Sequence, residues 1–209
     1  MLVASVADKV VTKATSLAEG LELLASHPRA CDELLAILDV LQERVSHATS
    51  PLATHADVPL EVHARYSRLE ILAAFGLRGG AKMPPWQTGV LWAKEAKADL
   101  LAFTLDKTSG GFSPTTRYRD YALSRELIHW ESQSATRSDS TAGRRYQRHA
   151  QDGSSIMLFA RLNTDERAFW FLGPASYVRH ESEQPMAVTW RLEHPLPADL
   201  YTTFAAAVA

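Results

Sequence analysis

One short run of the chain combines hydroxyl groups, arginines and tyrosines directly after two glycines. The run is GGFSPTTRYRDY, and its candidate donors are Ser113, Thr115, Thr116, Arg117 and Arg119. Hydroxyl and guanidinium groups supply many protein hydrogen bonds to nucleic-acid phosphates, and rings such as Tyr118 stack on bases. The same hydroxyl groups also satisfy the backbone of turns, and Arg119 can pair with Asp120. The run is therefore either a phosphate-binding surface or a hydrogen-bonded corner of the fold.

A second polar run, IHWESQS, has the alternation of a β-strand. In a strand, His129 and Gln133 share one face, and Trp130 points to the opposite face. The Gln133 amide has the donor and acceptor that read an adenine edge. Trp130 can stack on a base, but we expect it in the core, because large aromatic side chains dominate burial. The polar face is either a base-reading surface or a buried hydrogen-bond network.

A third run, GRRYQRH, is basic and aromatic. If this run is extended, Arg144, Tyr146 and Arg148 lie on one side and Arg145 lies opposite. Interleaved cations and rings can follow a nucleic-acid backbone while stacking on a base, although a solvated charge run is the alternative. From residue 117 to residue 148 the chain has seven arginines and no lysine. Arginine offers a planar fork of donors suited to phosphate, so we predict nucleic-acid binding here.

Catalytic motifs are incomplete. His129 and Glu131 have the H-x-E form of zinc deaminases, but Cys31 is the sole cysteine and the required thiolate pair is missing. The segment KEAKAD approaches a nuclease pattern, yet we expect Glu95 and Asp99 at a solvated strand edge. No P-loop or G-x-S-x-G motif is present. We therefore expect recognition rather than catalysis, with no metal and no cofactor.

The composition is that of an ordinary globular protein. The 209 residues are 46% hydrophobic and 22% charged, with a formal net charge of -2. The single cysteine excludes a disulfide framework and fits a reducing compartment, so we expect a cytoplasmic protein. No apolar run approaches the ~20 residues that span a bilayer, and we expect no membrane association. The first 60 residues are acidic, with four basic and eight acidic side chains.

Leucine spacing predicts helices over SLAEGLELLAS and over PRACDELLAILDVLQERVSH, where Pro28 suits the first turn. Residues 48–63 contain two prolines and are expected to form a linker. Ser67 and Glu70 form a capping-box pattern, and Gly76 is placed to end that helix. A last helix is predicted over PADLYTTFAAAV.

From residue 89 onward, short runs rich in β-branched and aromatic residues alternate with turn residues. The predicted strands are GVLWAKE, DLLAFTL, ELIHWES, SIMLFARL, AFWFLG and MAVTWRLE, with an exit turn at Gly173 and Pro174. Consecutive strands without long intervening helices indicate an antiparallel sheet. We predict an α+β protein, with a helical segment over residues 1–57 and a mostly antiparallel, β-barrel-like domain with a few flanking helices over residues 58–209.

The ordered motifs of the chain resemble a known family. The motifs are HARYSRLEILAAFG, FSPTTRYRDYALS, IHWESQS, GRRYQRH, LFAR, FLGPASYV and PMAVTWRLEHPLP. They resemble a bacterial domain of unknown function at the C-terminus of DEAD/DEAH-box helicase-like proteins, which often carry a phospholipase-D-type nuclease domain. The resemblance covers about residues 58–200 and implies restriction or phage defence acting on DNA. It supplies no catalytic residues, and this chain has neither a Walker motif nor an HxK motif.

These observations favour a non-catalytic module that recognises nucleic acid, most readily DNA that is modified or has a particular end. A second hypothesis is a module that docks on, or inhibits, a helicase or nuclease partner through its acidic helical part. A third is a metal-dependent nuclease that uses Glu95, Asp99, His129 and Glu131.

Overall fold

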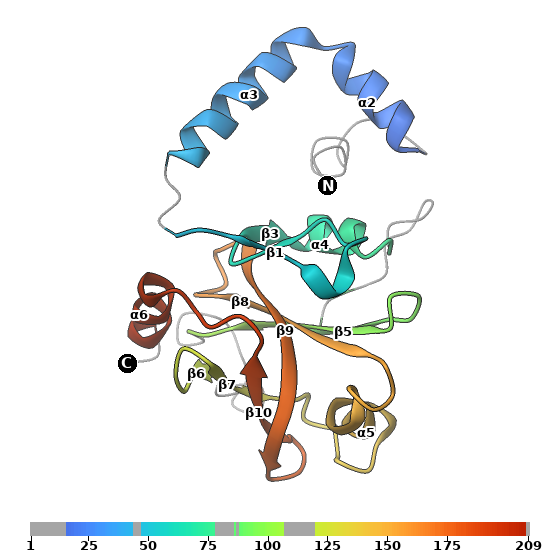
Figure 1. The fold of residues 1–209 in the computed structure, drawn as a ribbon, viewed down its shortest axis with the longest axis vertical. Coiled ribbons are helices and arrows are strands. Elements are labelled where there is room, and N and C mark those ends of the chain that lie inside the picture. Colours follow the sequence, from blue (N-terminus) through green and yellow to red (C-terminus); the bar gives the residue numbers. More distant parts are fainter. Residues whose placement is uncertain (1–15, 44–46, 78–85, 87, 107–119, 208–209) are drawn as a thin grey trace.

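The computed structural model describes residues 16–43, 47–77, 86, 88–106 and 120–207. Figure 1 shows an arch of two helices beside a domain built on a twisted sheet. The α-helices of the described residues are α2 (Leu17–Ala25), α3 (Pro28–Gln42), α4 (Arg68–Ala74), α5 (Thr141–Arg148) and α6 (Ala198–Ala206). None of these helices combines the length and the apolar character that crossing a bilayer requires.

The main sheet of the described residues has eight strands in the order β4-β5-β8-β9-β10-β7-β6, with β3 paired to β9. Its strands are β3 (Arg65–Ser67), β4 (Val90–Ala93), β5 (Ala98–Thr104), β6 (Tyr121–Ala122), β7 (Leu127–Glu131), β8 (Ser155–Arg161), β9 (Ala168–Glu181) and β10 (Ala187–Leu192). The pair β5–β8 is parallel and the other pairs are antiparallel. All six predicted strands, the capped helix α4 and the last helix α6 are confirmed.

Strand β9 runs through the predicted exit turn, so that prediction was wrong. Gly173 has φ +88, and a Cβ there would lie 3.1 Å from the side chain of Val62. A glycine is thus required for close approach of the backbone rather than for a turn. On one side of β9, pairing with β3 extends as far as Trp170 of β9, and pairing with β10 begins at Ala175 of β9. Pro174 falls in this gap, where β9 can accommodate a residue that lacks an N–H.

The sheet does not close into a barrel, which corrects the predicted architecture. Its described edges are β4 and β6, at opposite ends of the strand order. A barrel has one interior, whereas successive residues of β5 pack into two separate clusters. Leu101 and Phe103 join one cluster, and Leu100 and Ala102 join the other. Because both faces are covered by other elements, the sheet forms the middle of a layered fold.

The predicted linker also folds against the sheet. It forms β1 (Ser50–Pro51), a short 3-10 helix (Ala53–His55) and β2 (Glu61–Val62), and β1 pairs with β2. Leu52, Leu60 and Val62 are buried in the same cluster as Phe169 and Phe171 of β9. Apolar residues of this segment are therefore part of the core, and the segment is not a free linker.

His63 follows β2 and is a buried histidine in an unusual backbone conformation. Its side chain is 6% exposed, and its Nε2 atom has no hydrogen-bond partner among the described residues. Burial, and then the nearby positive charge of His47, lowers the pKa of His63 to about 4, and a hydrogen bond with the His194 backbone opposes this shift only in part. Burial also lowers the pKa of His47, but hydrogen bonds with the His63 carbonyl and Asp199 outweigh burial and raise it.

Replacing His63 by asparagine should flatten the pH dependence of stability. In the unfolded chain the His63 side chain is protonated near pH 6.5, whereas in the folded protein it stays neutral down to about pH 4. Between these two pH values, protonation of His63 therefore favours unfolding. His63 therefore contributes stability above pH 6.5 that is lost as the pH falls towards 4. We expect the wild type to lose about 2 kcal/mol more than His63→Asn across this range, as measured by urea unfolding. Asparagine tolerates the φ of +71 found at residue 63.

The control for this measurement is His27→Gln, because His27 is exposed and lies at the start of α3. Its pH profile should match that of the wild type. Equal slopes for His63→Asn and the wild type would contradict the assignment of the acid sensitivity to His63.

Candidate functional site

Half of the predicted binding residues fall on the described part of the chain. Ser113, Thr115, Thr116, Arg117, Tyr118 and Arg119 lie outside the described residues, so their role stays a prediction. The other six are His129 and Gln133, near β7, and Arg144, Arg145, Tyr146 and Arg148, on α5.

The GRRYQRH run is helical, so the prediction of an extended segment was wrong. Ser140 is the N-cap of α5, and its Oγ accepts a hydrogen bond from the Gly143 N–H at 3.1 Å. This cap starts a helix in which residues four apart share a face. Arg144 and Arg148 therefore project together from the exposed side of α5. Ser140, a preferred N-cap residue, was the sequence signal for this helix. The arginines placed on either side of Tyr146 at every second position indicated an extended segment instead.

Tyr146 points into the core instead of the binding surface. It is 1% exposed and contacts Trp130 and Trp190 edge to face, with ring centroids 5.7 Å and 6.1 Å away. Burial raises the pKa of Tyr146. The expected burial of Trp130 is confirmed, since it is 3% exposed in the same aromatic cluster. Tyr146 thus anchors α5 to the sheet and leaves the arginines on the outer side of the helix.

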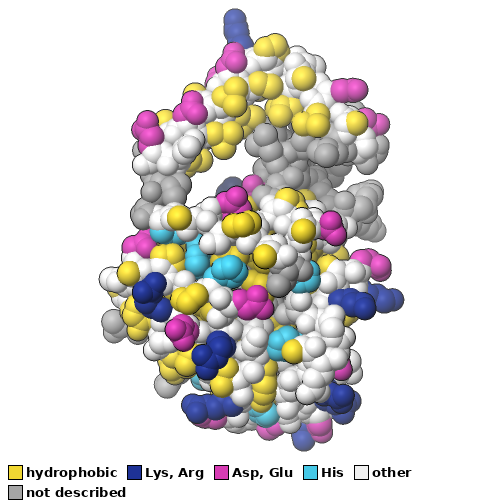
Figure 2. Space-filling view, in the orientation of Figure 1, with side chains coloured by type: hydrophobic (Ala, Val, Ile, Leu, Met, Phe, Trp, Pro, Cys, Tyr) yellow, Lys and Arg dark blue, Asp and Glu magenta, His cyan; other side chains and the backbone are white. Residues whose placement is uncertain are grey.

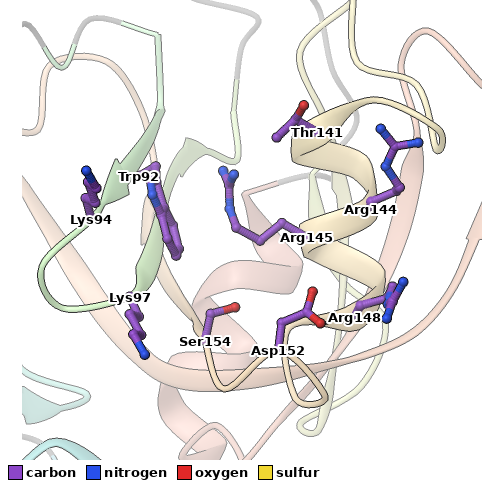
Figure 3. A pocket seen from close by; sticks show the side chains of 9 residues that line it. All are labelled: Trp92, Lys94, Lys97, Thr141, Arg144, Arg145, Arg148, Asp152 and Ser154. Atoms are coloured by element: carbon purple, nitrogen blue, oxygen red, sulfur yellow. Dashed lines mark ion pairs between the residues drawn. The ribbon is translucent and has the colours of Figure 1, made fainter.

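A basic pocket of about 650 Å³ lies between α5 and the turn that joins β4 to β5. Its lining residues are Trp92, Lys94, Lys97, Thr141, Arg144, Arg145, Arg148, Asp152 and Ser154. Figure 3 shows the two lysines on the side of the strands and Arg144 and Arg148 on the side of the helix. Arg145 reaches from the helix towards Trp92 between these two sides. Sequence reasoning missed Trp92, Lys94 and Lys97, which belong to a hairpin far from α5 in the chain.

Arg145 is held in place by a buried carboxylate and an aromatic ring. Its Nε and Nη2 donate to the two carboxylate oxygens of Asp99 at 2.5 Å and 2.7 Å. The guanidinium carbon lies 4.2 Å from the centroid of the Trp92 ring. Asp99 and Trp92 are paired residues on β5 and β4, so the hairpin presents both to the helix. This two-point contact fixes the arginine before any ligand arrives.

The electrostatics of the pair follow from its burial. Asp99 is fully buried, and burial raises the pKa of its carboxyl group, while the hydrogen bonds and charge of Arg145 act in the opposite direction. The hydrogen bonds with Asp99 raise the pKa of Arg145, which therefore stays charged. Asp99 had been expected at a solvated strand edge, and that prediction was wrong. Every residue of β5 is buried, so a charged side chain on this strand requires an ionic or hydrogen-bonding partner.

Removing the charge of Asp99 should destabilise the protein. In the wild type the guanidinium of Arg145 donates to two carboxylate oxygens, whereas the amide of Asp99→Asn offers it only one oxygen acceptor. Arg145 also loses its ionic partner in a poorly solvated site. We expect a loss of about 2 kcal/mol in the free energy of unfolding, measured by urea denaturation. Asp139→Asn is the matched control, because Asp139 pairs with Arg137 at 3.2 Å on the surface. That control should change stability by about 0.5 kcal/mol or less, and a similar loss in both variants would contradict a special role for Asp99.

The net charge of the pocket is positive. Lys94, Lys97, Arg144, Arg145 and Arg148 supply five positive charges. Asp99 and Asp152 supply two negative charges, and Asp152 lies 3.9 Å from Arg148. Five minus two leaves about three positive charges around one cavity in a chain whose formal net charge is -2. Such an arrangement attracts anions and can bind phosphate oxygens.

His129 and Gln133 do not line this basic pocket. The His129 ring stacks on Tyr121 with centroids 4.7 Å apart, and burial lowers the pKa of His129. The Gln133 Nε2 lies 3.5 Å from the carbonyl oxygen of Thr88. The structure therefore brings the arginines of α5 together with the β4–β5 hairpin, and it leaves the β7 residues apart from that group.

The residues of the nuclease hypothesis are not gathered into a metal site. Asp99 is committed to Arg145, whereas His129 and Glu131 lie on β7. Within the described ranges, no group of three histidine, cysteine, aspartate or glutamate side chains is arranged to hold a metal ion.

Comparison with known proteins identifies a family. No curated protein matches the chain. A family model described as a domain of unknown function, DUF3427, matches residues 60–204. This match takes in β3 to β10, α4, α5 and most of α6, and it includes every residue of the basic pocket. The chain therefore belongs to the DUF3427 family of domains of unknown function.

Proposed function

We propose that this chain is a non-catalytic DNA-recognition module whose phosphate contacts are made at the basic pocket. The observation that carries the proposal is Arg145, held by Asp99 against Trp92 at the centre of four further cations. A cation fixed in this way loses little conformational entropy on binding. The formal charge of the whole chain is slightly negative, so binding would depend on this local concentration of charge.

The exposed cations of the pocket suit a phosphate backbone. Arg144 and Arg148 lie on one side, and Lys94 and Lys97 lie on the other. If each neutralises one phosphate of duplex DNA, the logarithm of affinity falls with the logarithm of salt concentration with a slope of about -3 to -4. The run from residue 113 to residue 119 lies outside the described residues, and its contact with phosphate stays a prediction.

The resemblance to domains attached to helicase-like proteins supports a role in restriction or phage defence within the cytoplasm. A module in such a system has reason to inspect DNA for modification, and we include a modified base among the features to be recognised. Phosphate contacts at the basic pocket would position the module, and contacts with base edges would supply specificity.

Fluorescence anisotropy tests this proposal directly. The purified chain is titrated into labelled duplex DNA, cytosine-methylated duplex DNA, single-stranded DNA and RNA of the same sequence, at salt concentrations from about 50 mM to about 200 mM. We expect duplex DNA to bind with a steep salt dependence, and a preference for the methylated duplex would identify modification as the recognised feature. Absence of salt-sensitive binding to any of the four probes would refute the proposal.

The exposed apolar side chains of α3 favour a second candidate function, docking on a protein partner. Within the described part of the chain no residue of α3 is buried, although its sequence is amphipathic. Five apolar side chains are between 46% and 60% exposed: Leu35, Ile37, Leu38, Val40 and Leu41. Figure 2 shows apolar side chains along this helical arch together with acidic ones. Apolar surface of this kind often marks protein interaction sites.

Affinity capture separates the two candidates. A helicase or nuclease partner that docks on α3 should remain bound after nuclease treatment, and Leu38→Glu should release it. A partner that is lost with the nucleic acid would indicate that DNA bridges the two proteins.

A further inference from the structure

The cations of the basic pocket line one cavity from two elements that are distant in the chain. Lys94 and Lys97 are the first and last residues of the tight β4–β5 turn, where the Lys97 N–H donates to the Lys94 carbonyl at 3.2 Å. Arg145 reaches from α5 towards Trp92, whereas the Arg144 and Arg148 side chains lie along the outer side of the helix (Figure 3). A continuous strand is contacted efficiently by a stripe of cations along a groove. A cavity lined by several cations can in addition hold a single, highly charged group at the end of such a strand.

Arg145 can act as the fixed donor for that group. Two of its nitrogens are occupied by Asp99, and one face of the guanidinium rests on Trp92. Its Nη1 has no partner among the described residues and remains able to donate. The side chains of Thr141 and Ser154 add hydroxyl groups to the lining. A tetrahedral anion at this position would therefore meet charged donors and neutral donors together.

The charge of the pocket matches a phosphate monoester better than a diester. A monoester carries about -1.5 to -2 charge at neutral pH and three strong acceptor oxygens, whereas an internal phosphodiester carries one charge. The pocket offers about three net positive charges. Asp152 also lines the cavity, so a second phosphate following the first through the pocket would approach a carboxylate.

The volume of the pocket gives the size of the ligand. About 650 Å³ lies within the usual range of small-molecule pockets and exceeds what a lone phosphate ion requires. The cavity can therefore accept a terminal nucleotide together with its phosphate.

We propose that the basic pocket binds the terminal phosphate monoester of a nucleic-acid strand, with Arg145 as the fixed donor and the two lysines and two arginines as its flanking cations. This inference rests on the proposed function and makes it more specific, because it directs the module to phosphorylated strand ends. The phosphate can lie at a 5′ end or at a 3′ end, and both present the same monoester to the pocket.

Oligonucleotides that differ only at their ends test the inference. One duplex sequence is prepared with 5′-phosphate, 3′-phosphate or hydroxyl ends, carries an internal dye, and is titrated into the full chain by anisotropy. We expect one phosphorylated form to bind about tenfold more tightly than the hydroxyl form, which corresponds to one additional charge-assisted contact. The form that binds more tightly identifies the end. Free nucleoside monophosphate is measured in parallel by calorimetry.

Matched variants show whether the preference arises in the pocket. Lys94→Gln/Lys97→Gln should abolish the preference while leaving part of the affinity for hydroxyl-ended DNA. Arg179→Gln/Arg191→Gln removes the same charge at exposed positions on β9 and β10 and should keep the preference. Circular dichroism verifies that both variants are folded, and both replace surface side chains.

The possible failures are distinguishable. Equal binding of all three duplexes overturns this inference and leaves DNA recognition standing. A preference that persists in Lys94→Gln/Lys97→Gln also overturns it, because the end would be held elsewhere. Binding of the nucleoside monophosphate without binding of any duplex overturns both the strand-end assignment and the proposed function, and identifies the pocket as a mononucleotide site. Absence of binding to every probe overturns both proposals.

Discussion

Arg144→Gln/Arg148→Gln is expected to lower the affinity for duplex DNA about 30-fold at low salt. Both arginines are exposed on one face of α5 and line the basic pocket. If each contributes about 1 kcal/mol through a phosphate contact, the pair contributes about 2 kcal/mol, and each 1.4 kcal/mol corresponds to a factor of about ten. The slope of log affinity against log salt should fall in magnitude by about 2, because two fewer counterions are released.

Anisotropy titrations at several salt concentrations measure both quantities. The Arg179→Gln/Arg191→Gln variant provides the control, since it makes the same change in net charge on β9 and β10, away from the residues that line the pocket. It should reduce affinity about threefold or less, through the long-range field alone. Equal losses in the two double variants would show that DNA responds to overall charge and would contradict binding at the pocket.

Gly143→Ala is expected to destabilise the protein by about 3 kcal/mol, although the same change in most helices is stabilising. Alanine has a higher helix propensity than glycine by about 1 kcal/mol. At Gly143, however, a Cβ would lie 2.0 Å from the Arg137 carbonyl oxygen and 2.9 Å from the Ser138 Cα. Both are backbone atoms and cannot rotate away, so α5 or the loop before it must move. The melting temperature should fall, and the pocket should lose its affinity for DNA because α5 carries three of its cations.

Gly153→Ala separates steric conflict from the backbone cost of replacing a glycine. Gly153 has φ +63, and a Cβ there meets no atom within 4 Å. Its replacement should cost about 1 kcal/mol, from the left-handed conformation alone. Thermal unfolding followed by circular dichroism compares the two variants. If Gly143→Ala proved as stable as the wild type, the close packing of α5 on the loop from Arg137 would be disproved.

The sheet was largely predictable from the sequence, because alternation and turn residues are local signals. Each of the six predicted strands exists, and the capping box at Ser67 forms as expected. Two of the errors arose where two physical explanations share one pattern. Gly173 and Pro174 are typical of a turn, but here the glycine allows Val62 to approach β9. Ser140 and the following residues fit both a helix cap and a turn.

The candidate site was predictable only in part, because its halves are distant in the chain. The arginines of α5 were recognised as a basic cluster, although the geometry of that cluster was wrong. Trp92 and the two lysines join them through the pairing of β4 with β5 and the packing of α5 against that hairpin. Nothing in the local sequence links Asp99 to Arg145, which is 46 residues away. Contacts of this kind depend on tertiary structure, and one sequence contains no local signal for them.

The alternation of β5 between two hydrophobic clusters has a consequence for the way the domain unfolds. Neighbouring residues of β8 and β9 divide in the same way, with Leu158 and Leu172 in one cluster and Phe159 and Phe171 in the other. Neither cluster can lose these strands without exposing the other, so we infer that the two halves melt in a single cooperative transition. Asp99 lies on β5, one of these shared strands, and holds Arg145 of α5 through two hydrogen bonds. A partly unfolded domain would therefore have no basic pocket, and a ligand of that pocket would stabilise the whole domain.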